Sequence, residues 1–319
     1  MAKTTVVIPN YNGRKYLEPC LRSLMEGSTE AEIILVDNGS GDGSGLWAKE
    51  KFPRIKLIEM GENTGFSRAV NEGIKAARTE YVLLLNNDTV SGPHMVERLE
   101  KAMEGGKEIF SAGAKMVSMQ DPDKLDGAGD FYCALGWAFA RGKGRAAGAY
   151  SKPCRIFSAC AGAAIYRRAL FEKIGYFDEM HFAYLEDVDI GYRANIYGYH
   201  NRYEPGALVY HIGSAASGSR YNSFKARLSA RNSLYLVYKN MPILQILLNL
   251  PFLLAGFLAK YLFFARKGMG RVYLAGLRDG ARLSFSEGRK KKVRFSPFNL
   301  KNYLWLQGQL WLNIARRLQ

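Results

Sequence analysis

The first half of the chain alternates short apolar runs with stretches of helical periodicity. The apolar runs predict strands at residues 5–8, 32–36, 56–59 and 81–85, and the periodic stretches predict helices at residues 16–25, 44–51 and 67–77. Each apolar run ends in a polar turn that contains Gly or Asn. Repeated strand–turn–helix units are typical of a parallel sheet with helices on both faces. Ligands bind such sheets outside the carboxyl ends of the strands, where these polar turns lie.

The pattern weakens in the middle of the chain. Residues 118–152 are rich in Gly, Ala and aromatic side chains without clear periodicity, so we expect an insertion or a mobile loop there. Regular structure resumes at residues 156–166, followed by a helix at 168–174, a helix that starts near Glu186 and a closing strand at 207–211. We therefore predict an α/β domain over residues 1–221, with a donor half to about residue 117 and an acceptor half over 118–221.

Residues 222–319 have a different character, being helical, apolar and basic. Residues 242–265 are almost wholly apolar and approach the roughly 20 residues that span a bilayer. Pro251 is expected to kink this helix. Its polar positions form one narrow stripe, made up of Gln245, Asn249, Gly256, Lys260 and Lys267. A striped helix favours a position in the membrane interface over a spanning one, and the further alternative is a buried helix or an oligomer contact.

The charge distribution indicates an anionic partner for the same region. The net charge is +16, and residues 260–319 carry 14 Lys and Arg against 2 Asp and Glu, whereas residues 1–259 carry 31 against 27. The basic run from Arg289 to Lys292, with Trp305 and Trp311, favours an anionic membrane surface as the partner of residues 242–319. A nucleic-acid partner is the alternative class, but a long uninterrupted apolar helix argues against it, so we expect none.

The cysteines and the N-terminal residues bear on the compartment. Cys20, Cys133, Cys154 and Cys160 form no C-x-x-C pair and have no His at zinc-ligand spacing, which predicts reduced thiols in a cytosolic compartment. The first residues predict a strand and not a signal peptide. We therefore expect a domain held peripherally at the cytoplasmic face of the cell membrane.

Two aspartates follow predicted strands and are candidates for ligand binding. Asp37 could accept hydrogen bonds from a nucleoside, although an Asp at this place often only caps a turn. Asp88 follows an apolar strand, and a carboxylate delivered into a cleft is costly unless it meets a cation. Mg²⁺ or Mn²⁺ bridging a diphosphate would fit, with an Asx turn as the alternative.

A third cluster lies at the predicted helix start. Glu186, Asp187 and Asp189 fall within four residues, which the helix dipole alone can explain. Like charges this close also raise one another's pKa, which suits a general base. His211 ends the closing strand and is either a second metal ligand or a structural histidine.

The combination and order of these motifs resemble the family 2 inverting glycosyltransferases, most closely their bacterial rhamnosyltransferase-like branch. The resemblance covers about residues 4–240 and rests on residues 7–12 (VIPNYN), 36–40 (VDNGS), 63–66 (NTGF), 85–88 (LNND) and 186–189 (EDVD). It implies a GT-A fold, an α/β nucleotide-diphospho-sugar transferase fold with a Rossmann-like mixed sheet. Appended to it we expect the C-terminal helical, membrane-associating segment.

The resemblance also implies roles for individual residues. Asp37 matches the pyrimidine contact, and Asp88 matches the last position of a D-x-D metal motif in which Asn86 replaces the first Asp. Asp187 matches the catalytic base, beside Glu186, and His211 matches a metal-shell histidine of some members. The residues expected to bind the donor are Pro9, Tyr11, Asn12, Asp37, Asn38, Gly39, Asn63, Gly65, Phe66, Arg68, Asn71, Asn86 and Asn87. Those expected at the acceptor site are Ala161, Gly162, Ala163 and Asp189.

Val70 stands where many relatives carry Arg, so we expect Arg68 or Asn71 to take over its contacts. The function that follows is an inverting glycosyltransferase dependent on Mg²⁺ or Mn²⁺. It would move a sugar, with rhamnose from dTDP-rhamnose the favoured case, from a nucleotide-diphosphate donor to a lipid-linked glycan acceptor in cell-surface polysaccharide synthesis. The alternatives are a UDP-hexose donor or a non-catalytic membrane- or nucleotide-binding module. A nucleotidyltransferase usually opens with a Gly-rich, basic phosphate loop after the first strand, which residues 9–13 do not form.

Overall fold

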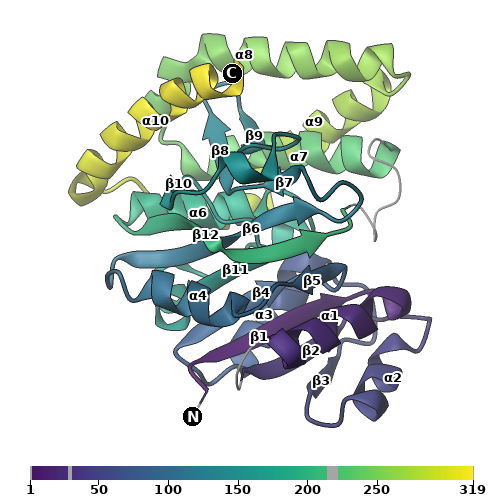
Figure 1. Ribbon diagram of the computed structural model, residues 1–319. Coiled ribbons are helices and arrows are strands. Elements are labelled where there is room, and N and C mark those ends of the chain that lie inside the picture. The colour runs from purple at the N-terminus through teal and green to yellow at the C-terminus, as the bar shows by residue number, and fades with distance from the viewer. Residues whose placement is uncertain (1, 28–30, 214–221, 319) are drawn as a thin grey trace.

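A computed structural model describes residues 2–27, 31–213 and 222–318; the predicted end of the catalytic domain, residues 214–221, lies outside this part. A ten-stranded mixed sheet forms its centre, in the order β10-β12-β6-β11-β4-β1-β2-β3, with β5 beside β12 and β7 beside β6 (Figure 1). The strands are β1 (Thr4–Asn10), β2 (Glu32–Asp37), β3 (Lys56–Glu59), β4 (Tyr81–Leu85), β5 (Thr89–Ser91), β6 (Ile109–Ser118), β7 (Leu125–Gly127), β10 (Cys154–Ile156), β11 (Ala163–Arg167) and β12 (His200–His211). The hairpin β8 (Asp130–Cys133) and β9 (Trp137–Ala140) forms a second sheet.

Helices cover both faces of the sheet because its parallel strands are apolar on both sides. In β1, Val6 and Ile8 enter one core cluster and Val7 enters the other, and all three are fully buried. The helices before residue 214 are α1 (Arg14–Gly27), α2 (Ser44–Lys51), α3 (Phe66–Ala76), α4 (Met95–Met103), α5 (Phe171–Ile174) and α6 (Glu186–Ile196). The four strands and three helices expected in the first half are all present, with bounds shifted by at most two residues at either end.

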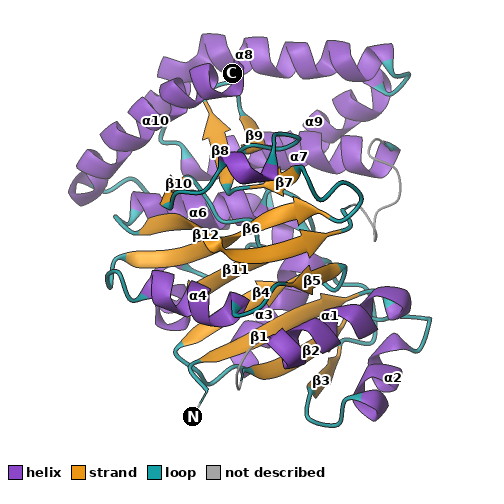
Figure 2. Cartoon of the chain, viewed as in Figure 1, coloured by secondary structure: helices purple, strands orange, loops and turns teal. Residues whose placement is uncertain are grey.

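The region of residues 118–152 corrects the expectation of an insertion or a mobile loop. It contains the end of β6, then β7 and the β8–β9 hairpin (Figure 2). The hairpin packs against the C-terminal helix α10 (Leu300–Leu318), where Ala134 N donates to Leu310 O (3.0 Å) and Asn313 Nδ2 donates to Tyr132 O (2.9 Å). Its partner lies almost 180 residues away, so local periodicity could not indicate this structure.

The C-terminal helices share a hydrophobic core with the sheet. They are α7 (Ser223–Asn240), α8 (Ile243–Arg266), α9 (Gly270–Phe285) and α10. Leu236 of α7, Leu253 of α8 and Leu306 of α10 belong to the same buried cluster as Val7 of β1. The change near residue 222 is therefore a change of surface character, and the hydrophobic core continues across it.

Helix α8 lies at the end of the molecule opposite the N-terminus (Figure 1). Gln245, Asn249 and Gly256 of its polar stripe are buried against the protein, whereas Lys267 at its end is exposed. Asn249 exchanges two 2.8 Å hydrogen bonds with Gln307 of α10, and Tyr192 of α6 donates to Gln245 (3.0 Å). Gly256 lies against the hairpin, where an added Cβ would meet Leu135 O at 2.1 Å. The apolar face points outward instead, which we did not anticipate, because the amides find their partners on the protein.

Candidate active site

Three polar side chains meet where β1, β2 and β4 end. Asn10 closes β1, and its Nδ2 donates to Asp37 Oδ1 (2.8 Å) while its Oδ1 accepts from Asn87 Nδ2 (2.7 Å). Ser40 Oγ also donates to Asp37 Oδ1 (2.6 Å). Asp37 Oδ1 therefore accepts hydrogen bonds from Asn10 and from the Ser40 hydroxyl, and Asp37 Oδ2 accepts one from Ser40 N (3.2 Å). These bonds hold the carboxylate in place. Sequence reasoning missed Asn10, although its place between Pro9 and Tyr11 at a strand end was a usable signal.

A second set of bonds joins the turns after β2 and β3. Asn38 Nδ2 donates to Asn63 Oδ1 (3.1 Å) and to Gly65 O (3.2 Å), and Asn38 Oδ1 accepts from Thr64. Gly39, with φ of +75°, sits against the Glu62 backbone, so a side chain would not fit there. The structure thus brings Asp37, Asn38, Gly39, Asn63 and Gly65 together at one edge of the sheet.

The other expected donor residues divide into open and closed positions. Tyr11, Asn12 and Arg68 are exposed, while Pro9, Phe66 and Asn86 are half-buried. Asn71 was expected to take over donor contacts, but it is buried and all its amide atoms are used. Its Nδ2 donates to Phe177 O (2.8 Å) and its Oδ1 accepts from Phe177 N (3.0 Å). Asn71 therefore joins α3 to the acceptor half, which leaves the exposed Arg68 as the alternative to the missing Arg.

Asp88 and His211 come together because β5 pairs with β12. Thr89, which follows Asp88, is directly opposite His211 in that antiparallel pair. The Asp88 Oδ1 to His211 Nε2 distance is 3.2 Å, close to the separation of about 3 Å that adjacent ligands of an octahedral Mg²⁺ or Mn²⁺ would have. His211 Nδ1 hydrogen-bonds to Asp126 Oδ2 (2.7 Å), so Nε2 faces Asp88. A carboxylate behind a metal-ligating His is a recurrent arrangement, and this donor set fits a divalent ion.

The electrostatics of this trio follow from its burial and pairing. Burial opposes a charged imidazole, but hydrogen bonds to Asp126 and Asp88 prevail and raise the pKa of His211 to about 9. The pKa of Asp126 is lowered, because its pairing with His211 and Lys143 outweighs the opposing effect of its burial. Asp126 lies on β7, in the region without periodicity, and sequence reasoning missed it.

Helix α6 begins at the predicted carboxylates. Asp187 is half-buried, and Val188 N donates to its Oδ1 (2.7 Å). Burial raises the pKa of Asp187, partly offset by backbone hydrogen bonds from Val188 and Ala161. Glu186 is more buried, its Oε2 has no hydrogen-bond partner among the described residues, and burial with the charge of Asp187 raises its pKa well above the ordinary value. Asp187 is thus the more accessible of the two bases.

A further carboxylate stands beside Asp187 that the sequence did not single out. Asp130, at the start of β8, lies with one oxygen within 4.8 Å of an oxygen of Asp187 and of the Cys160 sulfur. Burial and the charge of Asp187 raise the pKa of Asp130 well above its ordinary value. The pairing of β8 with residues near Ser158 brings this carboxylate in from the hairpin.

Comparison with known proteins addresses what such a site belongs to. The family profile described as Glycosyl transferase family 2 matches residues 5–175, more than half of the chain. The chain belongs to glycosyl transferase family 2. Among curated relatives of this glycosyltransferase is the N-acetylglucosaminyl-diphospho-decaprenol L-rhamnosyltransferase of Mycobacterium tuberculosis. It is 27% identical over an alignment 242 residues long that covers 67% of this chain and 77% of the relative. The poly-beta-1,6-N-acetyl-D-glucosamine synthase of Staphylococcus epidermidis is 26% identical over 63% of this chain and 47% of the relative.

Solved structures support the predicted GT-A fold. GalNAc-T7, solved with UDP, GalNAc and Mn²⁺, matches 75% of this glycosyltransferase and 48% of its own chain, with a TM-score of 0.61 and 16% identity. A mannosyltransferase from Pyrobaculum calidifontis, solved with GDP-Man and Mn²⁺, matches 99% of this chain and 86% of its own, with a TM-score of 0.54 and 16% identity. At these identities the likeness concerns the fold alone.

The expected acceptor residues do not all lie in one place in the glycosyltransferase. Ala161 and Gly162 border the site, where Gly162 O accepts from Asn86 N (2.9 Å), and Ala163 is buried in β11 opposite Leu85 of β4. Asp189 does not belong to this group, which corrects the expectation for it. It is fully buried, and its oxygens pair with Lys239 Nζ (2.8 Å), Arg193 and Asn240, so none is left for an acceptor.

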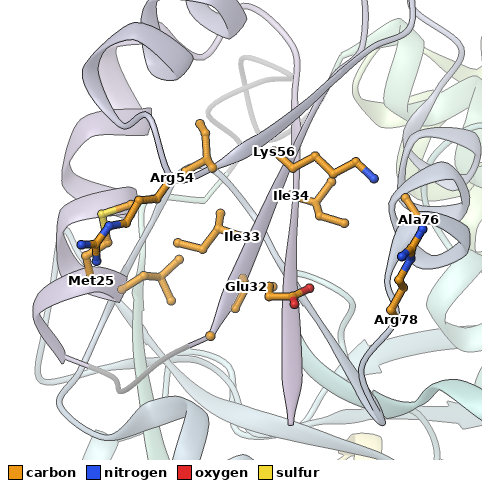
Figure 3. Close-up of a pocket in the computed structure, with 12 residues that line it drawn as sticks. Met25, Glu32, Ile33, Ile34, Arg54, Lys56, Ala76 and Arg78 are labelled. Atoms are coloured by element: carbon orange, nitrogen blue, oxygen red, sulfur yellow. The ribbon is translucent and has the colours of Figure 1, made fainter. Parts of the chain in front are cut away.

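One cavity of the glycosyltransferase lies away from this site. Its volume is about 570 Å³, and Glu32, Ile33, Ile34, Arg54 and Lys56 are among the residues that line it (Figure 3). These residues belong to the starts of β2 and β3, whereas the candidate site is at the carboxyl ends of the same sheet. Since ligands of parallel sheets bind at the carboxyl ends, we leave this cavity out of the active site.

Proposed function

We propose that this protein transfers a sugar, with inversion, from a nucleotide-diphosphate donor to an acceptor hydroxyl. The observation that carries the proposal is the Asp88–His211 pair and the bonds that connect its surroundings. Asn10 joins Asp37 to Asn87, which precedes Asp88, and the backbone of Ala161 and Gly162 bonds to Asp187 and to Asn86. The fold likeness to enzymes solved with UDP or GDP-Man and Mn²⁺ supports a nucleotide-sugar donor. Rhamnose from a dTDP donor is favoured by the M. tuberculosis relative, with UDP-hexoses as the alternative.

The residues divide the chemistry among them. Asp37 would accept hydrogen bonds from the nucleoside, and Arg68 lies exposed nearby to contact the phosphates. Asp88 and His211 would hold Mg²⁺ or Mn²⁺, which supplies charge neutralisation for a diphosphate leaving group. Asp187 would take the proton from the acceptor hydroxyl as that oxygen attacks the anomeric carbon. No covalent nucleophile is needed for a single displacement, and inversion follows from it.

The outward face of α8 supports a membrane-linked acceptor. Among the described residues, α8 is the helix long and apolar enough to cross a membrane by length and composition. Its exposed side chains include Ile243 (63%), Leu244 (77%), Leu254 (62%) and Leu258 (57%). Because Gln245, Asn249 and Gly256 are hydrogen-bonded to other parts of the protein, α8 could not cross a bilayer without carrying those parts into it. We therefore propose that α8 lies in one leaflet at the cytoplasmic face, with the basic residues 289–292 as a further contact to anionic headgroups.

The site would receive an acceptor whose sugar lies at that membrane surface. The M. tuberculosis relative is named for a diphospho-decaprenol-linked acceptor, and a polyprenyl-diphosphate-linked glycan is the acceptor we propose here. The glycan would reach Asp187 past Ala161 and Gly162, which border the site.

The test is nucleotide release from dTDP- and UDP-sugars with a lipid-linked sugar acceptor in vesicles, with Mn²⁺ or Mg²⁺ and with a chelator. We expect release from one donor, lost with the chelator and in Asp187→Asn by a factor of at least about 1000. Asp123→Asn, an exposed carboxylate in the same half, is the matched control and should match the wild type. Activity of Asp187→Asn at the wild-type level would overturn the assignment of the base, and release from no donor would overturn the reaction.

A further inference from the structure

The loop that leads into the catalytic helix has an unusual backbone. Residues 180–185 directly precede Glu186 and Asp187, and three of them have positive φ without being glycine. Phe182 has φ of +63°, and Tyr184 and Leu185 both have φ of +69°. Side chains with a Cβ rarely adopt such values, and they persist only where the surroundings hold them. Something must therefore hold this loop in the conformation that delivers Asp187.

Helix α7 makes the contacts that hold the loop. Asn232 is fully buried, and its Nδ2, with two hydrogens to donate, lies within hydrogen-bond distance of the carbonyl oxygens of His181 (2.9 Å), Ala183 (2.8 Å) and Tyr184 (2.7 Å). The preceding residue, Arg231, donates from Nη2 to Met180 O (2.7 Å) and His181 O (2.8 Å). Two neighbouring side chains of α7 thus bond to four consecutive or near-consecutive carbonyls of a loop that regular structure does not pair.

The loop is braced from the donor side as well. Ser67 N, at the start of α3, donates to Phe182 O (3.3 Å). Gly65 has φ of +85°, and a Cβ there would lie 2.6 Å from Phe182 O. The loop therefore lies between the turn expected to bind the donor and helix α7. Contacts on one side alone would leave it free to move toward the other.

Buried charges join the ends of the same segment to α7. Lys239 Nζ lies 2.6 Å from Asp178, just before the loop, and 2.8 Å from Asp189, just after the catalytic residues. All three side chains are almost fully buried. Asp178, His181 and Asp189 are close enough to hold a metal ion, but the ammonium of Lys239 already supplies the cation between the two carboxylates.

We propose that Asn232 and Arg231 are positioning residues for the catalytic base, which hold residues 180–185 so that Asp187 faces the acceptor. The inference rests on the proposed function, because it assumes that Asp187 is the base. Among the hydrogen bonds and ion pairs of the described residues, none joins either side chain to Asp187 or to the expected donor residues, so both act through the loop. The C-terminal helices are in this respect a part of the active site and not only of the membrane-facing surface.

The experiment compares Asn232→Ala and Arg231→Ala with Ser233→Ala. Ser233 is the matched control, because it is buried next to Asn232 and its hydroxyl has no hydrogen-bond partner among the described residues. Two readouts are taken in the full-length protein, hydrogen exchange of residues 180–188 and steady-state sugar transfer. Asn232→Ala should speed the exchange about tenfold or more. It should lower kcat by about 100-fold and leave the donor KM within about threefold, since only the base is displaced.

Arg231 is half-buried, so Arg231→Ala should fold and show the same pattern with a smaller loss of kcat, about tenfold. Ser233→Ala should match the wild type in both readouts. If Asn232→Ala does not fold, the Arg231→Ala result decides. Unchanged exchange, or faster exchange with unchanged kcat in the folded variant, would overturn the proposal. Failure of the proposed function is distinguishable, because the wild type itself would then transfer no sugar from any donor.

Discussion

The outward face of α8 allows a quantitative test of membrane binding. Leu254 on α8 is 62% exposed and Leu46 on α2 is 58% exposed, so the two leucines differ mainly in where they lie. Gln is a good helix former, so Leu→Gln changes the surface with little effect on the helix. Full burial of a Leu side chain contributes about 1.5–3 kcal/mol, and roughly two thirds of it is available at Leu254. We therefore expect Leu254→Gln to weaken vesicle binding by about 1–2 kcal/mol, or about 5–30-fold.

The same reasoning extends to a triple variant. Leu244→Gln, Leu254→Gln and Leu258→Gln together should cost roughly 3–6 kcal/mol and lower the partition coefficient at least about 100-fold. The assay is cosedimentation with vesicles that contain an anionic lipid, and Leu46→Gln is the control that should bind as the wild type. The melting temperature should not fall in any variant, because these side chains face away from the protein. A triple variant that binds vesicles like the wild type would refute the orientation of α8 as a membrane contact.

Three further predictions concern the site and the inner face of α8. Asp126 orients His211 and is not itself expected to contact the ion, so Asp126→Asn should weaken Mn²⁺ binding about 10–100-fold in a calorimetric titration. Wild-type affinity would contradict that role. Burial raises the pKa of Asp187, and a base is active only when deprotonated. As the pH is lowered, kcat should therefore begin to fall at a pH above the ordinary pKa range of Asp. A pH profile of kcat checks this, and a kcat that stays constant down to the ordinary Asp range would contradict the raised pKa. Asn249→Leu leaves the Gln307 amide and the Trp311 N–H without their partner, so the free energy of unfolding should drop by roughly 1–3 kcal/mol in thermal melts. An unchanged stability would mean that water replaces the lost hydrogen bonds.

The donor half was predictable because its signals are local. Each strand of the parallel part is a short apolar run, and each turn that follows it contains the side chains that meet at the sheet edge. Asp37 and Asp88 could be placed there from this pattern alone, but the pairing of Asp88 with His211 also needs β5, which the sequence did not predict. The bounds of α2 and β3 match the expected ranges residue for residue.

The parts that could not be predicted depend on distant partners. Asp126 and Asp130 belong to short strands whose stability comes from β6 and α10, so the sequence around them shows no period. Asp189 is indistinguishable from Asp187 in a run of acids, and only the arrival of Lys239 from α7 decides that it is buried and paired. The polar stripe of α8 was visible in the sequence, but whether it faced water or protein depended on Gln307, 58 residues away.

The inward stripe of α8 also determines how a version of this protein that needs no detergent should be made. Removing the helix would uncover Tyr192, Gln307 and Trp311, whose partners lie on it, and would open the hairpin that Gly256 covers. Deletion of residues 243–266 should therefore give aggregated material instead of a smaller enzyme. Replacing the outward-facing leucines of α8 with Gln or Lys leaves the hydrogen bonds of its inner face in place. Such a variant could be purified, crystallised and assayed without detergent.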